Sequence, residues 1–198
     1  RNLIQSGGPE FSEKQAKAMA AMFEVETGPD QDGEMFMRPA ILSDKLGTFP
    51  LSTKDDINSA LDAAHAAFPS WAATPAPTRG QIIGNMGRLL MEHKDAIVAL
   101  ETREIGKTLK ESAGSVQEAI DTCLFFQSEG RRLYGQTVNS ELPDKELFTY
   151  RRPLGVCGII NACNFPAAVP FWKMIPAIMC GNTCVWTVSY THLTLPTI

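Results

Sequence analysis

The sequence predicts an α/β protein in which several helices precede a strand–helix–strand unit with a parallel sheet. First, apolar residues recur with helical spacing through much of residues 52–133. Second, the run Val156–Ile160 is continuously apolar, which is typical of a strand buried on both faces of a parallel sheet. Third, Ala167–Cys180 is long enough for a helix and separates that run from a second apolar run, Thr183–Trp186.

Four helices are predicted in the middle of the chain. The first starts at Ser52–Asp55, where a capping sequence precedes an apolar stripe, and ends at Pro69. The second opens at Pro75 and Pro77. The remaining helices span Ala96–Glu104, closed by Gly106, and Lys110–Leu133, with Gly130 near its end.

The two ends of the chain are predicted less fully. Ser12–Phe23 has helical spacing and Gly28–Gly33 has the composition of a loop, while Met35–Leu51 is expected to hold short strands with a turn near Leu46-Gly47. Leu147–Arg151 is short and β-prone. In the helix at residues 167–180, Pro170 fits the first turn and Pro176 predicts a kink, and Gly181-Asn182 predicts the C-cap.

Composition excludes several classes of protein. The 198 residues are 44% hydrophobic and 20% charged, as in ordinary globular proteins. The net charge of −4 and the lack of a basic patch argue against a nucleic-acid partner. The absence of an 18-residue apolar run argues against a membrane span. The first residues are no secretory signal, and the missing initiator Met indicates a fragment.

The cysteine pattern predicts neither a disulfide framework nor a metal site. The number of cysteines is odd, and four of the five lie in one apolar region without CxxC spacing. The expected state is reduced, buried thiols in a cytoplasmic protein. The cysteines are Cys123, Cys157, Cys163, Cys180 and Cys184.

A P-loop-like stretch is rejected. Glu104-Ile-Gly-Lys-Thr108 ends like a phosphate-binding loop, but Glu101 stands where the first glycine is needed, and no buried strand precedes it.

Asn164 has two interpretations from the residues alone. The predicted strand ends at Ile160, and open α/β sheets bind ligands beyond the carboxyl ends of their strands. An Asn placed there can direct its amide N–H donors into a cleft. An Asn before Phe165-Pro166 equally suits a turn.

A series of motifs occurs in order along the chain: Phe68-Pro-Ser-Trp71, Arg79, Glu104-x-Gly106-Lys107, Gly135, Ala162-Cys-Asn-Phe-Pro166, Lys173, Pro176-Ala-Ile178 and Gly181-Asn182. Together these motifs resemble the aldehyde dehydrogenase superfamily over residues 46–186, whereas residues 1–45 match poorly. The resemblance implies a truncated N-terminal, Rossmann-like cofactor-binding domain that uses NAD or NADP.

The resemblance also implies roles for single residues. Asn164 corresponds to the oxyanion-hole Asn, which donates to the aldehyde oxygen during thiol attack. The loop that touches the nicotinamide cofactor corresponds to Ile160, Asn161, Ala162 and Cys163. Lys173 matches a lysine near the active site, although a solvated helix lysine fits equally. Arg79 and Glu104 match positions interpreted as structural.

Cys163 stands where many family members have Trp and is not expected to be the nucleophile, because no base lies nearby in sequence. In the family the catalytic Cys and the Glu base lie further along the chain. This chain is therefore expected to lack both, and to be poorly soluble and inactive by itself.

The resemblance stops after Trp186. The family continues with Lys-Pro-x-Glu-x-Thr-Pro, but Thr187 and Tyr190 replace the Lys and the Glu. Residues 187–198 are interpreted as a non-native tail. Residues 142–153 are expected to belong to the family's oligomerisation arm, with a homodimeric or homotetrameric parent.

The implied reaction of the parent enzyme is oxidation of an aldehyde, which could be a semialdehyde, to a carboxylate. Two alternatives stay open: a CoA-acylating or phosphate-semialdehyde member of the superfamily, and a non-functional, misassembled reading frame.

Overall fold

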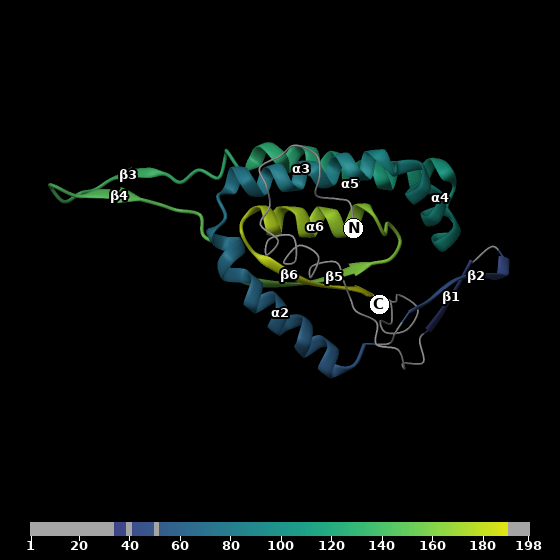
Figure 1. Ribbon diagram of the computed structural model, residues 1–198. Helices are drawn as coiled ribbons and strands as arrows, with labels where there is room; N and C mark the ends of the chain where they lie inside the picture. Colours follow the sequence, from purple (N-terminus) through teal and green to yellow (C-terminus); the bar gives the residue numbers. More distant parts are fainter. Residues whose placement is uncertain (1–33, 39–40, 50–51, 190–198) are drawn as a thin grey trace, which may run out of the picture.

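The computed structural model describes residues 34–38, 41–49 and 52–189 (Figure 1). The predicted helix at 12–23, the predicted loop at 28–33 and residues 190–198 lie outside the described residues. The elements, in chain order, are β1 (Glu34–Arg38), β2 (Ile41–Phe49), α2 (Lys54–Ala73), α3 (Ala76–Glu92), α4 (Lys94–Ile105), α5 (Leu109–Glu129), β3 (Thr137–Asn139), β4 (Glu146–Phe148), β5 (Val156–Ala162), α6 (Ala168–Met179) and β6 (Thr183–Ser189).

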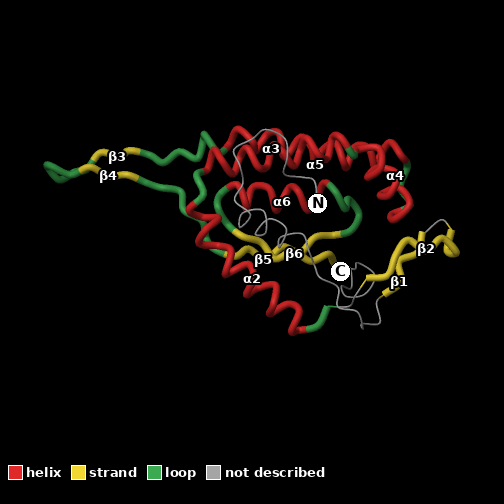
Figure 2. The backbone as a smooth tube through the Cα atoms, in the orientation of Figure 1, coloured by secondary structure: helices red, strands yellow, loops and turns green. Residues whose placement is uncertain are grey.

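The elements form layers around the parallel pair β5–β6 (Figures 1 and 2). Helix α6 covers one face of this pair, and α3 and α5 pack side by side over α6. Helix α2 crosses the opposite face and packs mainly against β6. The predicted α/β class with a parallel strand–helix–strand unit is confirmed.

Two helices begin with the same reciprocal cap. At the start of α2, the Asp56 carboxylate accepts from the Thr53 N–H at 2.7 Å, and the Thr53 hydroxyl accepts from the Asp56 N–H at 3.3 Å. Thr108 and Glu111 repeat the arrangement at α5. Because these bonds favour the charged forms, they hold the pKa of Asp56 and of Glu111 below the ordinary values.

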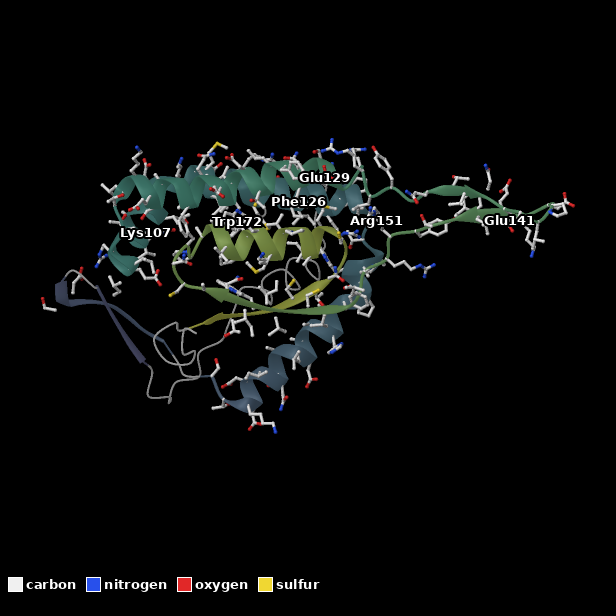
Figure 3. All side chains as sticks on the ribbon, turned by 180° about the vertical axis from the view of Figure 1, so that it is seen from behind. Lys107, Phe126, Glu129, Glu141, Arg151 and Trp172 are labelled. Carbon is white, nitrogen blue, oxygen red and sulfur yellow. The ribbon has the colours of Figure 1, made fainter. Side chains whose placement is uncertain are left out.

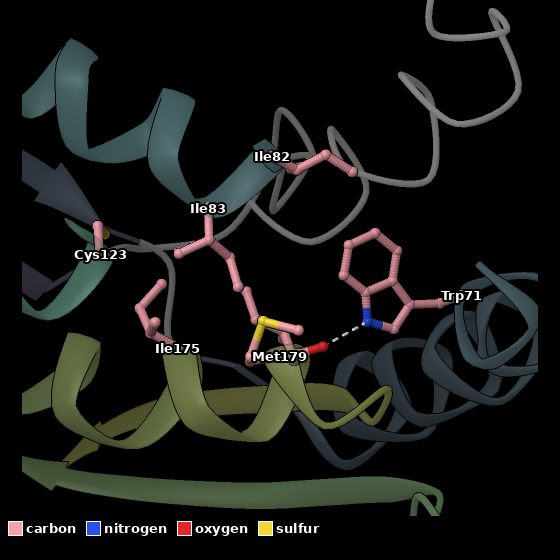
Figure 4. Close-up of a cluster of buried hydrophobic side chains, with 7 residues drawn as sticks. Trp71, Ile82, Ile83, Cys123, Ile175 and Met179 are labelled. Atoms are coloured by element: carbon pink, nitrogen blue, oxygen red, sulfur yellow. Dashed lines mark hydrogen bonds between the residues drawn. The ribbon is translucent and has the colours of Figure 1, made fainter. Parts of the chain in front are cut away.

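The prediction that Pro69 ends the first helix is wrong, since α2 continues to Ala73. Proline removes one helical N–H, but Pro69 and His65 are both exposed, so water can satisfy the carbonyl left without a donor. Trp71, one turn from the helix end, is buried, and its Nε1 donates to the Ile178 carbonyl at 2.9 Å (Figure 4). This anchor holds the last turn of α2 in place.

The main core lies where α2, α3, α5 and α6 meet (Figure 4). Burial of these apolar side chains is the main favourable contribution to folding. The fully packed members are Trp71, Ile82, Ile83, Cys123, Ile175, Ile178 and Met179.

Glycines bring α3 and α5 unusually close together. A Cβ on Gly80 would lie 2.3 Å from the Gln127 carbonyl oxygen, and one on Gly87 would lie 2.8 Å from the Cys123 Cβ. Gly84 faces the Gln127 side chain at a similar distance. The sequence predicted the start of this helix, but its glycine-lined face against α5 is a feature of the structure alone.

Arg79 joins the ends of two helices. Its Nε donates to the Met179 carbonyl of α6 at 3.0 Å, and its Nη1 donates to the carbonyl of Thr74, just after α2. The guanidinium thereby satisfies carbonyls that helix C-termini leave without partners. Burial lowers the pKa of Arg79 from its ordinary value. These contacts support the structural interpretation of Arg79.

Asn182 ties the start of β5 to the end of α6. Its Oδ1 accepts from the Leu154 N–H at 2.6 Å and from the Gly155 N–H at 3.1 Å, while its Nδ2 donates to the Ala177 carbonyl at 3.0 Å. Gly181, with φ of 91°, ends the helix as predicted. The motif Gly181-Asn182 therefore fixes the crossover between helix and strand.

The parallel strands are longer and more exposed than predicted. Strand β5 continues past Ile160 to Ala162, and β6 continues past Trp186 to Ser189, with Ala162 paired to Ser189. Burial on both faces is wrong for β5: Asn161 is buried, whereas Ile160 is exposed. The face towards α2 stays open because α2 covers mainly β6.

The N-terminal hairpin also departs from expectation. The predicted turn near Leu46-Gly47 is wrong, because both residues lie inside β2. Phe36 pairs with Gly47 and Met37 pairs with Lys45, so Leu46 is an extra residue in the ladder, as in a β-bulge.

A β-prone segment was predicted at Leu147–Arg151, and β4 occupies Glu146–Phe148. This strand pairs with β3 in an antiparallel hairpin that projects far from the helices (Figures 1 and 2). All residues of both strands are exposed. Across residues 34–38, 41–49 and 52–189, no helix has the length and apolarity needed to cross a membrane.

The close packing of α3 on α5 predicts that Gly80→Ala destabilises the chain by about 1–3 kcal/mol, because the new methyl group meets a backbone carbonyl. The matched control is Gly114→Ala in α5, where a Cβ meets nothing within 4 Å. This control should stabilise the chain by about 0.5–1 kcal/mol through helix propensity. Urea unfolding followed by circular dichroism measures both, and equal shifts would contradict the packing argument.

Candidate functional site

The candidate site is the turn that follows β5 and leads into α6. Residues 163–167 form this turn at the carboxyl end of the parallel pair. Asn164 is exposed there, so its amide is open to a ligand. The Val169 N–H donates to the Phe165 carbonyl at 3.1 Å, which closes the turn onto the first turn of α6. The position agrees with the edge at which open α/β sheets bind ligands.

The four residues predicted to line the cofactor do not form one loop. Ile160, Asn161 and Ala162 lie within β5, and only Cys163 belongs to the turn. Ile160, which is 75% exposed, and Ala162 share the open face of the strand. Their contact with a cofactor stays a prediction.

Asn161 points to the opposite face and is only 3% exposed. With its side-chain amide oriented to suit its neighbours, the Oδ1 of Asn161 accepts from the Trp186 indole N–H at 3.1 Å. Its side chain therefore bridges β5 and β6 instead of facing the open side of the strand. Any contact of Asn161 with a ligand would have to be made by its backbone.

A buried carboxylate from α4 supports the turn. Glu101 is 3% exposed, and its Oε2 accepts from the Ser115 hydroxyl of α5 at 3.0 Å. The Ala168 N–H in turn donates to the Ser115 hydroxyl at 3.4 Å. The first amide of α6 is thus linked through Ser115 to Glu101, and both side chains come from other helices.

A lysine completes this support. Gly106, with φ of 79°, ends α4 and turns the chain so that Lys107 lies over Phe165. Lys107 is at the end of the helical layer that is far from the hairpin arm, the projecting β3–β4 ribbon (Figure 3). The Lys107 Nζ lies 3.2 Å from the centroid of the Phe165 ring and 3.7 Å from Glu101 Oε1. Phe165 directly follows Asn164, so this cation–π contact acts on the candidate residue's neighbour.

Glu101 and Lys107 form a charge pair that is largely shielded from water. Burial raises the pKa of Glu101, and its hydrogen bond from Ser115 and the Lys107 charge oppose the rise. Glu104 also has a raised pKa, first from burial and then from the negative charge of Glu101.

Glu101 was not predicted as a member of the site, although its position carries one signal. It follows Val98 by three residues on the inward stripe of α4, where an apolar residue is expected. Lys107 entered the predictions only through the rejected P-loop-like stretch and a family motif.

Other candidate residues lie in different settings. Lys173 is exposed on α6, and its proposed nearness to an active site stays a prediction. The five cysteines are thiols, but the expectation of burial holds fully only for Cys123, whereas Cys180 is exposed. Within the described ranges, no group of three or more His, Cys, Asp or Glu residues is arranged to hold a metal ion.

Comparisons with known proteins match this architecture. The sequence model of the aldehyde dehydrogenase family matches residues 15–194, a wider range than the resemblance at 46–186. An α-ketoglutarate semialdehyde dehydrogenase from Haloferax volcanii is 40% identical over 147 residues, covering 74% of this chain and 30% of that protein. A probable acylating methylmalonate-semialdehyde/malonate-semialdehyde dehydrogenase from Dictyostelium discoideum is 38% identical, covering 69% and 26%.

Solved structures agree. A betaine aldehyde dehydrogenase point mutant from Staphylococcus aureus, solved with NAD+, superposes with a TM-score of 0.79 at 28% identity, covering 84% of this chain and 34% of that one. The chain belongs to the aldehyde dehydrogenase family. It spans about a third of the length of the relatives it matches.

Thiol accessibility predicts which cysteines react in the folded chain. Burial raises the pKa of Cys123 and of Cys184 to about 12, so neither forms a thiolate near neutral pH. Cys180 is exposed and should react with a disulfide reagent within the mixing phase at pH 8. Cys180→Ser should remove that phase, and Cys123 and Cys184 should react only after urea is added. Rapid labelling of Cys123 in the native chain would contradict the described core.

Proposed function

We propose that this chain is the N-terminal part of an enzyme that oxidises an aldehyde to a carboxylate with NAD or NADP. The observation that carries the proposal is the exposed Asn164 amide on a supported turn at the carboxyl end of β5. Semialdehyde dehydrogenases among the relatives favour a semialdehyde substrate. The protein is proposed to work in the cytoplasm.

Asn164 supplies an N–H donor to the aldehyde oxygen. As a thiolate attacks the carbonyl carbon, negative charge moves onto that oxygen, and the Nδ2–H of Asn164 stabilises it. Such a donor lowers the barrier only if it is already held in place, because reorganisation during the reaction would offset the gain. The bond from the Ala168 N–H to Ser115, and that from Ser115 to Glu101, are proposed to provide that rigidity.

The open face of β5 suits a flat ring. Ile160 and Ala162 are exposed on that face, just before the turn that carries Asn164. A nicotinamide bound there would supply the acceptor for the hydride that leaves the aldehyde carbon. Thr187, which pairs with Ile160, stands where the family has its ribose-binding lysine, so this strand offers no ammonium group for the ribose.

The nucleophilic thiol and the carboxylate base are proposed to come from polypeptide beyond these 198 residues. The short coverage of the relatives supports this proposal. The chain alone is therefore proposed to be inactive.

Residues 187–198 are proposed to be a non-native tail that arose from a misassembled reading frame. An independent sequence of the source DNA tests this proposal. If the same codons continue without interruption through Trp186-Thr187, the tail is native and the proposal is wrong.

The hairpin arm is proposed to mediate assembly of the longer enzyme as a homodimer or homotetramer. Residues 142–153 include β4, and the arm exposes the apolar side chains of Val138, Leu147 and Phe148. Exposed apolar side chains on a projecting two-stranded ribbon are suited to pairing with another subunit.

A second candidate function is acyl transfer to coenzyme A, or reduction of an acyl phosphate, by the same site. The acylating relative favours the first of these. In both cases Asn164 would have the same role. The acceptor of the acyl group would be set by residues outside this chain, so product analysis of the longer enzyme with and without coenzyme A separates the candidates.

The oxyanion role predicts that Asn164→Ala in the longer enzyme lowers kcat by about 10²–10³. Steady-state oxidation of a semialdehyde, followed by cofactor absorbance, measures this. Asn58→Ala, at an exposed position of α2, is the matched control and should keep full activity. An Asn164→Ala enzyme with unchanged kcat would remove the basis for the proposed role.

A further inference from the structure

We propose that Lys107 and Glu101, with Ser115, form a positioning device that sets the orientation of the Asn164 turn. The three residues come from the end of α4, the following loop and α5, and they converge beneath residues 165–168. The link to catalysis rests on the proposed function of Asn164. The proposed control of the turn's orientation does not rest on that function.

The device holds the turn from two sides. On its carboxyl side, the Ala168 N–H donates to the Ser115 hydroxyl, and that hydroxyl donates to the Glu101 carboxylate. Nearer Asn164, the Lys107 ammonium lies 3.2 Å from the Phe165 ring centroid. Because Phe165 adjoins Asn164 in the chain, a fixed ring limits the backbone rotations that would move the Asn164 amide.

Stability alone is a poor explanation for this arrangement. Buried ion pairs are often no more stable than apolar residues of the same volume, because desolvation offsets the attraction between the charges. The pair is not optimised for strength either. Glu101 Oε1 and Lys107 Nζ are 3.7 Å apart, and neither atom makes a hydrogen bond. A charged pair that adds little stability yet lies against Phe165 of the turn, and is bonded to the Ser115 hydroxyl that holds the first amide of α6, is better explained by control of geometry.

The arrangement also explains why a lysine is needed at 107. Its ammonium serves two partners at once, the Glu101 carboxylate and the face of the Phe165 ring. An apolar side chain could fill the space but would leave Glu101 buried without a counter-charge. The carboxylate would then have to take up a proton or move towards water, and in moving it would release the Ser115 hydroxyl that holds the Ala168 N–H.

The first test uses the 198-residue chain and amide hydrogen exchange resolved by residue. In Lys107→Met, the amides of Ala167, Ala168 and Val169 should exchange about tenfold faster, the factor set by loss of a partly buried cation–π contact. Exchange in the α3 core, at Ile82 and Ile83, should not change.

The controls separate positioning from general destabilisation. Lys107→Arg keeps a cation over the ring and should restore most of the protection. Lys110→Met, at an exposed lysine of α5, should match the unmodified chain. Unchanged exchange at the turn, or equal acceleration at the turn and in the core, would overturn the proposal. If Lys107→Met does not fold, Phe165→Leu gives the local comparison, because it removes the ring that the ammonium contacts and leaves the Glu101–Lys107 pair in place; faster exchange at residues 167–169 supports the proposal, and unchanged exchange overturns it.

The second test is a double-mutant cycle in the longer enzyme. Lys107→Met should lower kcat about tenfold with little change in KM, and it should have no further effect in an Asn164→Ala background, because its influence passes through that residue. Equal losses in both backgrounds would overturn the coupling. An Asn164→Ala enzyme of full activity would refute the oxyanion role alone, because the exchange result at the turn is independent of it.

Discussion

The carboxyl end of α6 is the point on which the rest of the structure depends. Trp71 donates to the Ile178 carbonyl, Arg79 donates to the Met179 carbonyl, and Asn182 binds the start of β5 beside them. These bonds satisfy carbonyls that a helix end leaves open, and they attach α2, α3 and β5 to one site. Helix α6 starts directly after the candidate turn and ends at this junction. The junction therefore fixes the far end of the helix that follows Asn164.

The opposite end of α6 is held by a different kind of interaction. There the partners are a buried carboxylate, a hydroxyl and an ammonium, and they contact a turn that must stay open to ligand. Apolar packing could fix the helix, but it could not supply a hydrogen-bond acceptor for the buried backbone N–H at the start of α6. Polar contacts therefore hold the start of α6, next to the turn that carries Asn164. Hydrogen bonds at its carboxyl end join the helix to the rest of the core.

Much of the fold was predictable from local patterns. Thr53 before an acidic residue and an apolar stripe marked the start of α2, and Gly181-Asn182 marked the end of α6, because caps depend on neighbouring residues. Features set by distant residues were missed. Pro69 was taken as a helix end because the anchor of Trp71 on Ile178 was not visible in the sequence. The exposed face of β5 depends on where α2 crosses the sheet. At the site, the family resemblance pointed to Asn164, whereas the role of Glu101 depends on its contacts with Ser115 and Lys107, which lie outside its own helix.

The bonds at the end of α6 also have a consequence for the order of folding. They join residues 107 positions apart in the case of Trp71 and Ile178, and 100 apart for Arg79 and Met179. Thr183 reaches back 119 positions to the Ala64 carbonyl. Contacts of such separation form late, because loop closure must precede them. During synthesis, α2 to α5 leave the ribosome before α6 and β6, so the apolar side chains that α6 covers stay exposed until α6 follows.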